Sequence, residues 1–400
     1  MSTVLRYVNK TRHVVERFIR IEHVSNTTAL SLKAVIDKLF SKFGLSISRL
    51  HGQDYDGASN MQGQFNGLKA LILKENPCAF YVHCFTYQLQ LAFVAVAKKH
   101  VQVTSLFNLV SRVVSIVGAS SKCCDLLREK QEAIIFEAPH NGDISSGWDL
   151  NQQSTITHFS DTRCGSHYGT LISLISIFSP IVDVLEMIVD DGSTEQKCEV
   201  DDLLDSIQSF EFAFNLHLMI TILEISNELS KALQRKDQDI VNAITLVKIC
   251  KQSLQVMRDN EWDLFLKAMV SFCEKQNIDV PDMDGVFIRR GRSRRNTEEM
   301  TNLHHFHVDL FYAIIDMQLQ ELNDRFFDVS TKLLLCIAWL CPNDSFFVFD
   351  KEKLIHFAEY YPKDFSRVKL MALDDQLQTY IFYMYSNKEF EELRRLDELG

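Results

Sequence analysis

Two acidic residues two positions apart, Asp54 and Asp56, end a short stretch of strand-forming residues. Side chains at positions i and i+2 of a strand share a face, so these carboxylates could bind a divalent cation together. Asp56 also begins a turn before a predicted helix, where α/β sheets commonly present functional carboxylates. A two-metal site that acts on phosphodiesters, however, takes its acidic ligands from several elements. On this motif alone we favour a turn at Asp56, a helix cap at Ser59 or Asn60 and a solvated strand end at Asp54.

The sequence has one locally basic segment, in residues 289–295. It contains Arg289, Arg290, Arg292, Arg294 and Arg295. Such a cluster could contact nucleic-acid phosphates or serve as a nuclear import signal. Two glutamates follow at positions 298 and 299, and a solvated loop is the third alternative. The whole chain has 42 basic and 53 acidic residues, and its formal net charge of −11 argues against binding nucleic acid through its overall field.

Histidine and cysteine occur near two predicted strand ends but lack the spacing of a metal site. His83 and Cys84 end one strand and His51 lies on another, whereas a zinc site needs four ligands at a recognisable spacing. Tyr87 stands three residues after Cys84, where a histidine would be needed. Three histidines in residues 304–307 begin a predicted helix, on which only one or two can share a face. We assign both groups structural or surface roles and predict no bound metal.

The composition is that of a globular chain of 400 residues, 46% hydrophobic and 24% charged. Ten cysteines without a Cys-x-x-Cys pair are typical of reduced thiols, which predicts a location in the nucleus or cytoplasm. The sequence has no glycine-rich phosphate loop, no Gly-x-Ser-x-Gly and no His-Glu-x-x-His motif. It shows no secretory signal, and apolar runs such as residues 91–97 are shorter than the roughly 18 residues that span a bilayer, so we expect no membrane contact.

The elements that would position these residues follow from the hydrophobic pattern of residues 1–136. We predict a hairpin of strands 4–9 and 14–24, a helix 32–43 closed by Gly44, a strand 45–55, a helix 61–76, a strand 79–84 and helices 87–99 and 103–117. The helix 61–76 rests on an apolar stripe of Met61, Phe65, Leu68 and Ile72. This order predicts an α/β domain whose later strands run parallel.

Beyond residue 136 the pattern is helical. Residues 137–161 are polar and predict a surface connection. After it we predict helices at 167–190, with a kink at Pro180, and at 202–235, 239–276 and 303–341. The predicted fold class is therefore α/β plus all-α, with the α/β part in residues 1–136 and the helical part in residues 137–400.

Several segments of the chain resemble a known family. They are HGQDYDGASNM at 51–61, FNGLKALI at 65–72, YVHCF at 81–85, TRCGSH at 162–167, ELNDRF at 321–326, LCP at 340–342 and YPKDF at 361–365. Together they extend over nearly the whole chain. They resemble proteins derived from hAT-superfamily DNA transposases, in the branch of MYM-type zinc-finger-like proteins common in plant genomes.

This resemblance implies a partial ribonuclease-H-like transposase core in residues 1–136, followed by a large helical insertion domain in residues 137–400. In active relatives an Asp-Asp-Glu set binds two Mg²⁺ ions that activate water or a DNA 3′-hydroxyl. Asp56 matches the second carboxylate, whereas the first would precede residue 4 and the glutamate would follow residue 400. The family's Cys-x-x-His and Thr-Arg-Trp-Gly-Ser signatures are also altered, with Tyr87 and Cys164 at the positions of the histidine and the tryptophan.

One carboxylate of three cannot hold two divalent ions at useful affinity. The resemblance therefore implies a degenerate, catalytically inactive transposase without a cofactor, truncated at both ends. It also implies a gap in the sheet, because the first strand of this fold normally lies between the hairpin and the strand that ends at Asp56. We expect either new pairing across this gap or unpaired backbone groups within it.

These observations leave three hypotheses about function. The leading one is a helical scaffold for protein interactions without enzymatic activity. The alternative is a nuclear nucleic-acid-binding protein of transposon origin that uses the arginines of residues 289–295. The third, an active nuclease, would require metal-dependent turnover that Asp56→Ala abolishes. The partners would be protein or DNA, in the nucleus or the cytoplasm, and the oligomeric state is left open.

Overall fold

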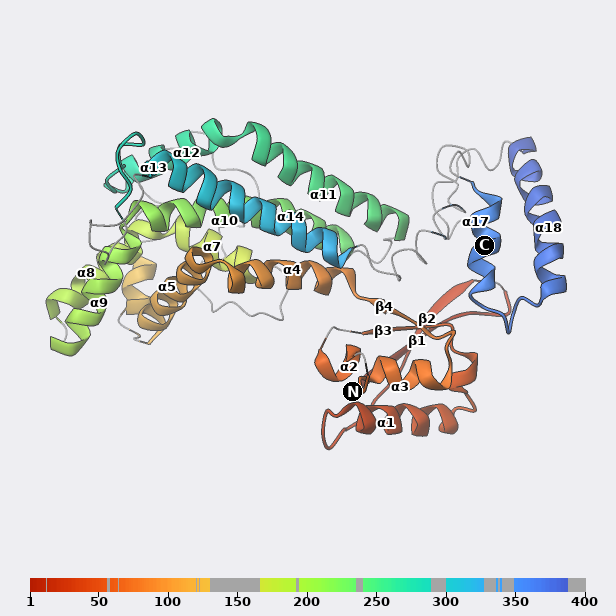
Figure 1. The fold of residues 1–400 in the computed structure, drawn as a ribbon. Helices are drawn as coiled ribbons and strands as arrows, with labels where there is room; N and C mark the ends of the chain where they lie inside the picture. The colour runs from red at the N-terminus through yellow and green to blue at the C-terminus, as the bar shows by residue number, and fades with distance from the viewer. Residues whose placement is uncertain are drawn as a thin grey trace. The chain divides into compact units, whose positions relative to one another are not determined.

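Figure 1 shows a computed structural model of the chain. It describes residues 1–11, 13–55, 58–63, 65–119, 121, 123–129, 166–191, 194–234, 240–288, 300–326, 336, 339 and 349–387. The contacts divide the chain into two compact units. Unit 1 comprises Met1–Gln88, Ala232–Val247 and Asp324–Gly400, and unit 2 comprises Leu89–Lys231 and Lys248–Asn323.

This grouping differs from the two parts predicted from the sequence. The predicted boundary at residue 136 lies outside the described residues and stays a prediction. Within the described chain, the two helices that follow the last strand group with unit 2 from Leu89 onward, and the last helices of the chain return to the strands of unit 1. A hydrophobic pattern reports neighbours along the chain, so it does not detect this return.

Unit 1 holds the strands. Its elements are β1 (Ser2–Val8), β2 (Val14–Ile21), α1 (Ala29–Lys42), the 3₁₀ turn η1 (Ile47–Arg49), β3 (Gly52–Tyr55), α2 (Ser59–Gln62), α3 (Leu68–Glu75), β4 (Phe80–His83), α17 (Lys351–Glu359) and α18 (Arg367–Ser386). Among the described residues the strands form two separate pairs, β1 with β2 antiparallel and β3 with β4 parallel. Of the two outcomes expected for the gap in the sheet, new pairing across it is not seen in the described strands, because no ladder joins the two pairs.

Helices α1 and α3 form the small core of unit 1 with one face of the strands. The buried residues are Ala29, Leu32, Phe40, Ile47, Leu68, Ile72 and Ala79. Leu5 of β1 and Tyr55 of β3 pack against them. Helix α1 begins at Thr28, whose Oγ1 accepts a hydrogen bond from Ser31 N at 3.4 Å, and Gly44 follows its end with φ +64°. The predicted glycine closure of this helix is confirmed.

The other face of the hairpin is open. Val4 and Val8 of β1 and Val14 and Phe18 of β2 are each more than half exposed. Register pairs Val4 with Phe18 and Val8 with Val14, and the Arg6–Glu16 ion pair lies between these two apolar pairs on the same face. We call these four residues the hairpin face.

The single helix predicted over residues 61–76 is wrong in its first half. The structure has the short α2 and then α3, and Phe65 between them is 82% exposed. The cause is a close approach of two glycines: Gly67 N donates to Gly63 O at 3.0 Å, and a Cβ on Gly67 would overlap the backbone of Gly63. The strand predicted over residues 45–55 is also shorter, because residues 47–49 form η1.

Unit 2 is built from helices. They are α4 (Phe85–Lys99), α5 (Val101–Gly118), α7 (Ser166–Ser176), α8 (Phe178–Asp191), α9 (Thr194–Ile207), α10 (Phe210–Leu233), α11 (Ile240–Asn260), α12 (Trp262–Lys275), α13 (Asn302–His304), the π-helix η3 (His305–Tyr312) and α14 (Ala313–Arg325). The first turn of α4, the first eight residues of α11 and the last two residues of α10 and of α14 belong to unit 1. Phe214 of α10 is fully buried, and its ring centroid lies 5.2 Å from that of Phe265 and 5.0 Å from that of Phe306.

Three of the long helices predicted after residue 166 are each divided in two, and the fourth, predicted over residues 303–341, lies partly outside the described residues. Residues 167–190 form α7 and α8, which meet at a bend of 74°. The bend lies at Ile177, three residues before Pro180, because proline lacks an N–H group and its ring clashes with the carbonyl of residue i−4. Residues 208–209 separate α9 from α10, where Ser209 Oγ accepts a hydrogen bond from Phe212 N at 3.2 Å. Glu261 separates α11 from α12.

Helix α5 follows its prediction closely. The predicted stripe of Val103, Leu106, Val110, Val113 and Val117 is buried. Among the described helices α5 alone is long and apolar enough to cross a bilayer by length and composition, and the bent α7–α8 pair meets the same test only if counted as one span. Helix α5 packs on α8 and α9, as the core helix of a bundle does. The expectation of no membrane contact stays a prediction.

Candidate functional site

The end of β3 is held by side chains on one face of the β3–β4 pair. Gln53 and Tyr55 lie opposite Tyr81 and His83 in the register, so the four side chains share that face. Tyr55 Oη donates to Gln53 Oε1 at 2.6 Å, and Tyr81 Oη donates to the Tyr55 carbonyl at 3.0 Å. Gln53 Nε2 donates to the carbonyl of Ala79 at 2.8 Å. These bonds fix the strand directly before the predicted carboxylate.

This face is aromatic. The ring centroids of Tyr55 and Tyr81 are 4.9 Å apart, and Lys69 Nζ lies 4.9 Å from the centroid of Tyr81. The ring of His83 lies 5.9 Å from that of Tyr81 and 5.7 Å from that of Tyr87. Burial raises the pKa of Tyr55 far above its ordinary value, so its hydroxyl stays neutral. Both tyrosine hydroxyls already donate within this face, and Gln53 and Tyr81 are buried, so the face contributes to the packing of unit 1.

Asp54 alternates onto the opposite face of β3. Protein atoms that displace water around its carboxyl raise its pKa above the ordinary value, and the charge of Arg6 on β1 lowers it by less. Arg6 itself donates from Nε to Glu16 Oε1 at 2.8 Å. The influence of Arg6 on Asp54 means that β1 runs near β3, although no ladder joins the two strands.

Asp56, the predicted remnant of a catalytic set, lies outside the described residues. Among the residues that the structure does describe, no three His, Cys, Asp or Glu side chains gather as ligands of a metal ion. The Mg²⁺ pair of active relatives needs several converging anionic oxygens. The groups described around the end of β3, which are neutral rings, amides and a carboxyl with a raised pKa, do not fit such a pair. No metal-dependent step follows from them.

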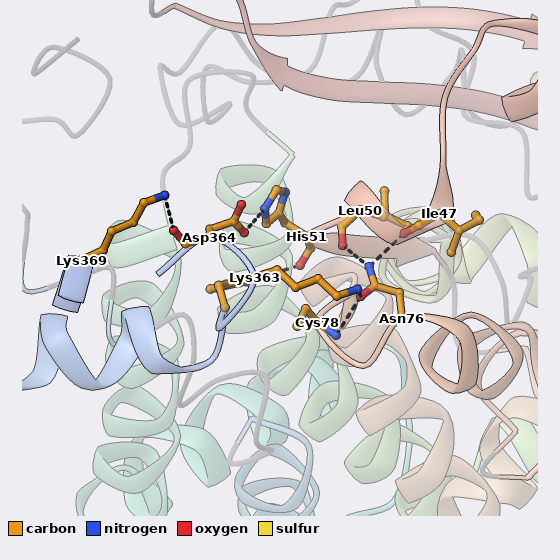
Figure 2. Close-up of polar contacts among 9 residues, drawn as sticks. Ile47, Leu50, His51, Asn76, Cys78, Lys363, Asp364 and Lys369 are labelled. Carbon is orange, nitrogen blue, oxygen red and sulfur yellow. Dashed lines mark hydrogen bonds and ion pairs between the residues drawn. The ribbon is translucent and has the colours of Figure 1, made fainter. Parts of the chain in front are cut away.

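A polar cluster that sequence reasoning missed ties the α17–α18 connection to the start of β3 (Figure 2). His51 Nε2 lies 2.8 Å from Asp364 Oδ2, and Tyr361 Oη donates to the His51 carbonyl at 3.3 Å. Lys369 Nζ, in the first turn of α18, donates to the Asp364 carbonyl at 2.9 Å. The two contacts of His51, with Asp364 and with Tyr361, join residues more than three hundred positions apart in the sequence.

Asn76 is the buried centre of this cluster. It is 1% exposed, and its Nδ2 donates to the carbonyls of Ile47 at 2.9 Å and Leu50 at 2.7 Å. Its Oδ1 accepts from Lys363 Nζ and from Cys78 N, each at 3.3 Å (Figure 2). The only sequence signal here is the Asn-Pro pair at 76–77, which predicts a turn but not the partners of the side chain.

Aromatic contacts extend the same attachment to β4. The ring of Phe80 packs edge to face against Tyr360 and Tyr361, with centroid distances of 5.7 and 5.5 Å. Phe80 alternates with Tyr81 along the strand, so it shares the face of Asp54. Residues 360–361 therefore lie on the face of the β3–β4 pair that is opposite to Tyr55.

A family model described as the ZMYM1/FAM200 RNase-like domain matches residues 1–67. The match takes in β1, β2, α1, β3 and α2, and its residues include Asp56. It supports the resemblance at its coarser level: the N-terminal part is similar to an RNase-like domain of transposase-derived proteins. The large helical part predicted to follow is consistent with the helices of unit 2.

The described residues on either side of the basic segment lie next to each other. Its five arginines lie outside the described residues. On either side of it, Val286 and Thr301 form an isolated antiparallel bridge, and Phe287 N donates to Met300 O at 2.7 Å. Residues 289–299 therefore leave and rejoin the described chain next to α13 and η3.

Two of the three histidines of residues 304–307, His305 and His307, belong to the aromatic core of unit 2, and His304 is exposed. The ring of His305 stacks on Phe287 with centroids 3.7 Å apart and planes 17° apart. The ring of His307 stacks on Trp262 at 4.1 Å and 19°. Burial lowers the pKa of His307, which favours its neutral form. These contacts agree with the structural role assigned to this group from the sequence.

Proposed function

We propose that this chain is a degenerate hAT transposase derivative without strand-cleaving activity, and that it acts as a scaffold for protein interactions. The match of residues 1–67 to an RNase-like domain supports its origin. The resemblance of further segments, at 81–85, 162–167 and 321–326, extends that support along the chain and favours the MYM-type zinc-finger-like branch. The observation that carries the proposal is the division of the strands into two separate pairs.

A divided sheet is a poor frame for two-metal catalysis. Two ions about 4 Å apart must be clamped by carboxylates that different elements hold in a fixed relation. Among the described residues β1–β2 and β3–β4 share no ladder, so hydrogen bonds between strands do not fix that relation. Burial raises the pKa of Asp54, the described carboxyl nearest to Asp56 along the chain, and so makes its charged form less favourable than in water. Both features oppose the binding of a divalent pair.

The test is a cleavage assay on the full chain with Mg²⁺ or Mn²⁺ and with nicked and hairpin DNA. We expect no product above the protein-free control. Asp56→Ala and, as a matched control two residues earlier in the chain, Asp54→Ala are assayed beside the unaltered chain. Metal-dependent turnover that is lost in Asp56→Ala would overturn the proposed inactivity.

The scaffold role is supported by exposed apolar surface on unit 1. The four residues of the hairpin face are each more than half exposed, and large apolar side chains of α18 are exposed to a similar degree. Contiguous apolar surface on a folded protein marks sites of interaction with other macromolecules. A scaffold of this kind needs no catalytic group, which agrees with the chemistry at the end of β3.

Binding of nucleic acid through residues 289–295 is the second candidate function. It is favoured by five arginines within a segment whose two ends are held together by the Val286–Thr301 bridge. The net charge of −11 opposes it. A gel-shift titration at several salt concentrations separates the two candidates, because phosphate contacts make affinity fall steeply with ionic strength. Replacing the five arginines by glutamine would remove that dependence if this candidate is right and change nothing if the scaffold role is right.

We place the chain in the nucleus, by its resemblance and by the basic segment, with the cytoplasm as the alternative. The same five-glutamine variant tests this location. A fluorescent fusion of the full chain should concentrate in the nucleus, and the variant should lose that concentration if the segment is an import signal. Equal distributions of the two fusions would remove the segment as support for a nuclear role.

A further inference from the structure

Helix α18 carries an apolar row on a face that it does not bury. Val368, Met371, Phe382 and Tyr385 are 77%, 72%, 62% and 60% exposed. They occupy the ends of a series at positions 368, 371, 375, 378, 382 and 385, whose alternating spacing of three and four keeps one line along a helix. The two middle positions of this row are an aspartate and a glutamine.

The opposite face of α18 is anchored within unit 1. Ile381 and Met384 are buried, and Phe349 packs against them. Lys351 Nζ of α17 lies 2.9 Å from Asp374 Oδ1 of α18, and the two helices run side by side in Figure 1. Because these contacts fix the rotation of the helix, the apolar row is presented on one defined side.

We propose that α18 pairs with α18 of a second copy of this chain, in antiparallel orientation about a two-fold axis between residues 376 and 377. The proposal rests on the scaffold role and names one of its partners. In a two-fold contact, residue i meets residue j and j meets i. The facing pairs are Val368 with Tyr385, Met371 with Phe382 and Asp375 with Gln378, each formed twice.

Charge complementarity selects this arrangement. In a parallel pair in register, Asp375 would face the Asp375 of the other copy, and two like charges would meet in the middle of the contact. In the antiparallel pair each Asp375 carboxylate faces a Gln378 amide, which can donate a hydrogen bond to it. A polar residue within an apolar helical row sets the register and orientation of such pairs. Antiparallel packing also brings Arg367 and Lys369 beside the carbonyl end of the facing helix, where cations are favoured.

The length of α18 limits the area that the contact can bury, and with it the expected affinity. Helix α18 has 20 residues, and at about 1.5 Å per residue it is about 30 Å long. A contact made by one such helix from each copy lies at the small end of specific interfaces. We therefore expect a reversible dimer with a Kd on the order of 10 µM.

Sedimentation equilibrium of the full chain from about 1 to 300 µM, which brackets that affinity, tests the proposal. The unaltered chain should pass from monomer to dimer across this range. Phe382→Glu places a charge against Met371 of the other copy, within an apolar part of the contact, and should raise the Kd at least about tenfold. Since the side chain is exposed, the variant should keep the circular dichroism spectrum of the unaltered chain.

The orientation is tested by Gln378→Lys. In the antiparallel pair the new ammonium faces Asp375 of the other copy twice, and the Kd should fall about threefold. In a parallel pair the new lysines would face each other, and the Kd would rise. Gln376→Lys makes the same change at an exposed position of α18 outside the row, and should leave the Kd unchanged.

A chain that stays monomeric at every concentration would overturn the proposal. So would a dimer that Phe382→Glu leaves intact, or one that Gln378→Lys weakens. None of these measurements involves DNA cleavage, so a failed dimer leaves the proposed inactivity standing. Conversely, metal-dependent cleavage would remove the proposed function without changing the Kd.

Discussion

The strands of unit 1 and the helices of unit 2 differ in how completely they bury their side chains. Neither β1 nor β2 has a fully buried residue, whereas thirteen of the 24 residues of α10 are buried. A helix satisfies most of its backbone hydrogen bonds internally, so a bundle is complete once its apolar faces meet. A strand needs a neighbour at each edge and cover on its apolar faces. The helices of unit 2 therefore bury much of their surface against one another, whereas the hairpin of unit 1 leaves apolar side chains exposed.

Truncation of the core of unit 2 should give the largest effect in this comparison. Phe214→Ala removes a fully buried ring that contacts Phe265 and Phe306. The lost contacts and the cavity should reduce the free energy of unfolding by about 3–5 kcal/mol. Thermal unfolding followed by far-ultraviolet circular dichroism measures it. A loss below about 1 kcal/mol would mean that the helical core is loosely packed, and the contrast with unit 1 would disappear.

The polar centre of unit 1 should give the next largest effect. Asn76→Ala removes the hydrogen bonds from Nδ2 to Ile47 O and Leu50 O and leaves both carbonyls without these partners. We expect a loss of about 2–3 kcal/mol in urea unfolding. Asn60→Ala is the matched control, because its amide makes one exposed hydrogen bond, to Thr27 O, and should cost under about 1 kcal/mol. Equal losses of unfolding free energy in the two variants would show that the buried hydrogen bonds of Asn76 contribute no more to stability than the exposed one of Asn60.

Lowering the pH should change the contributions of the two units to folding stability in opposite directions. In unit 2, burial lowers the pKa of His100, His217 and His307 below the ordinary value near 6.5. The unfolded histidines then take up protons first, so their contribution to stability is complete above about pH 6.5 and is lost as the pH falls through the lowered folded values. In unit 1, the raised pKa of Asp54 means that the folded carboxyl takes up its proton first, so its cost to stability is relieved as the pH falls through the raised value.

A single substitution in each unit separates these contributions. His217→Asn should flatten the decline in Tm between about pH 7 and 5 by the equivalent of about 1 kcal/mol for each unit of pKa shift removed. Asp54→Asn should instead raise the Tm at neutral pH and have less effect in acid. A His217→Asn chain whose Tm falls with acid as steeply as that of the unaltered chain would contradict the assigned sign.

The hairpin face should give the smallest effect. Phe18→Ala truncates a side chain that is more than half exposed, and we expect the free energy of unfolding to change by less than about 0.5 kcal/mol. Leu5→Ala, on the face that packs against the core of unit 1, serves as the comparison and should cost more. Chemical denaturation measures both. A loss above about 1 kcal/mol for Phe18→Ala would show that something covers this face in solution.

Sequence patterns predicted the features that depend on neighbouring residues. The stripe of α5 and the glycine closure of α1 were predicted correctly because the periodicity of a helix and the left-handed conformation of Gly44 are local. Pro180 correctly marked an interrupted helix, although the break falls at Ile177. The helix through Phe65 was wrong because its apolar spacing outweighed the two glycines that flank that residue.

Features that depend on distant residues were not predicted. His51 and Asp364 are separated by 313 positions. From its local sequence, each residue would be predicted to be a solvated side chain. The buried role of Asn76 likewise depends on Lys363, which no local pattern connects to it. Asp56 and the five arginines lie outside the described residues, so their assigned roles stay predictions.

The bridge between Val286 and Thr301 makes residues 289–299 a practical place for a reporter. Both ends of this stretch are clamped to each other, so an epitope or fluorophore grafted there would not pull on α12 or η3. Doubling the length of a loop costs only about 0.6 kcal/mol. A label inserted there would follow the protein in cells while leaving α18 and the hairpin face, the surfaces assigned to partners, unmodified.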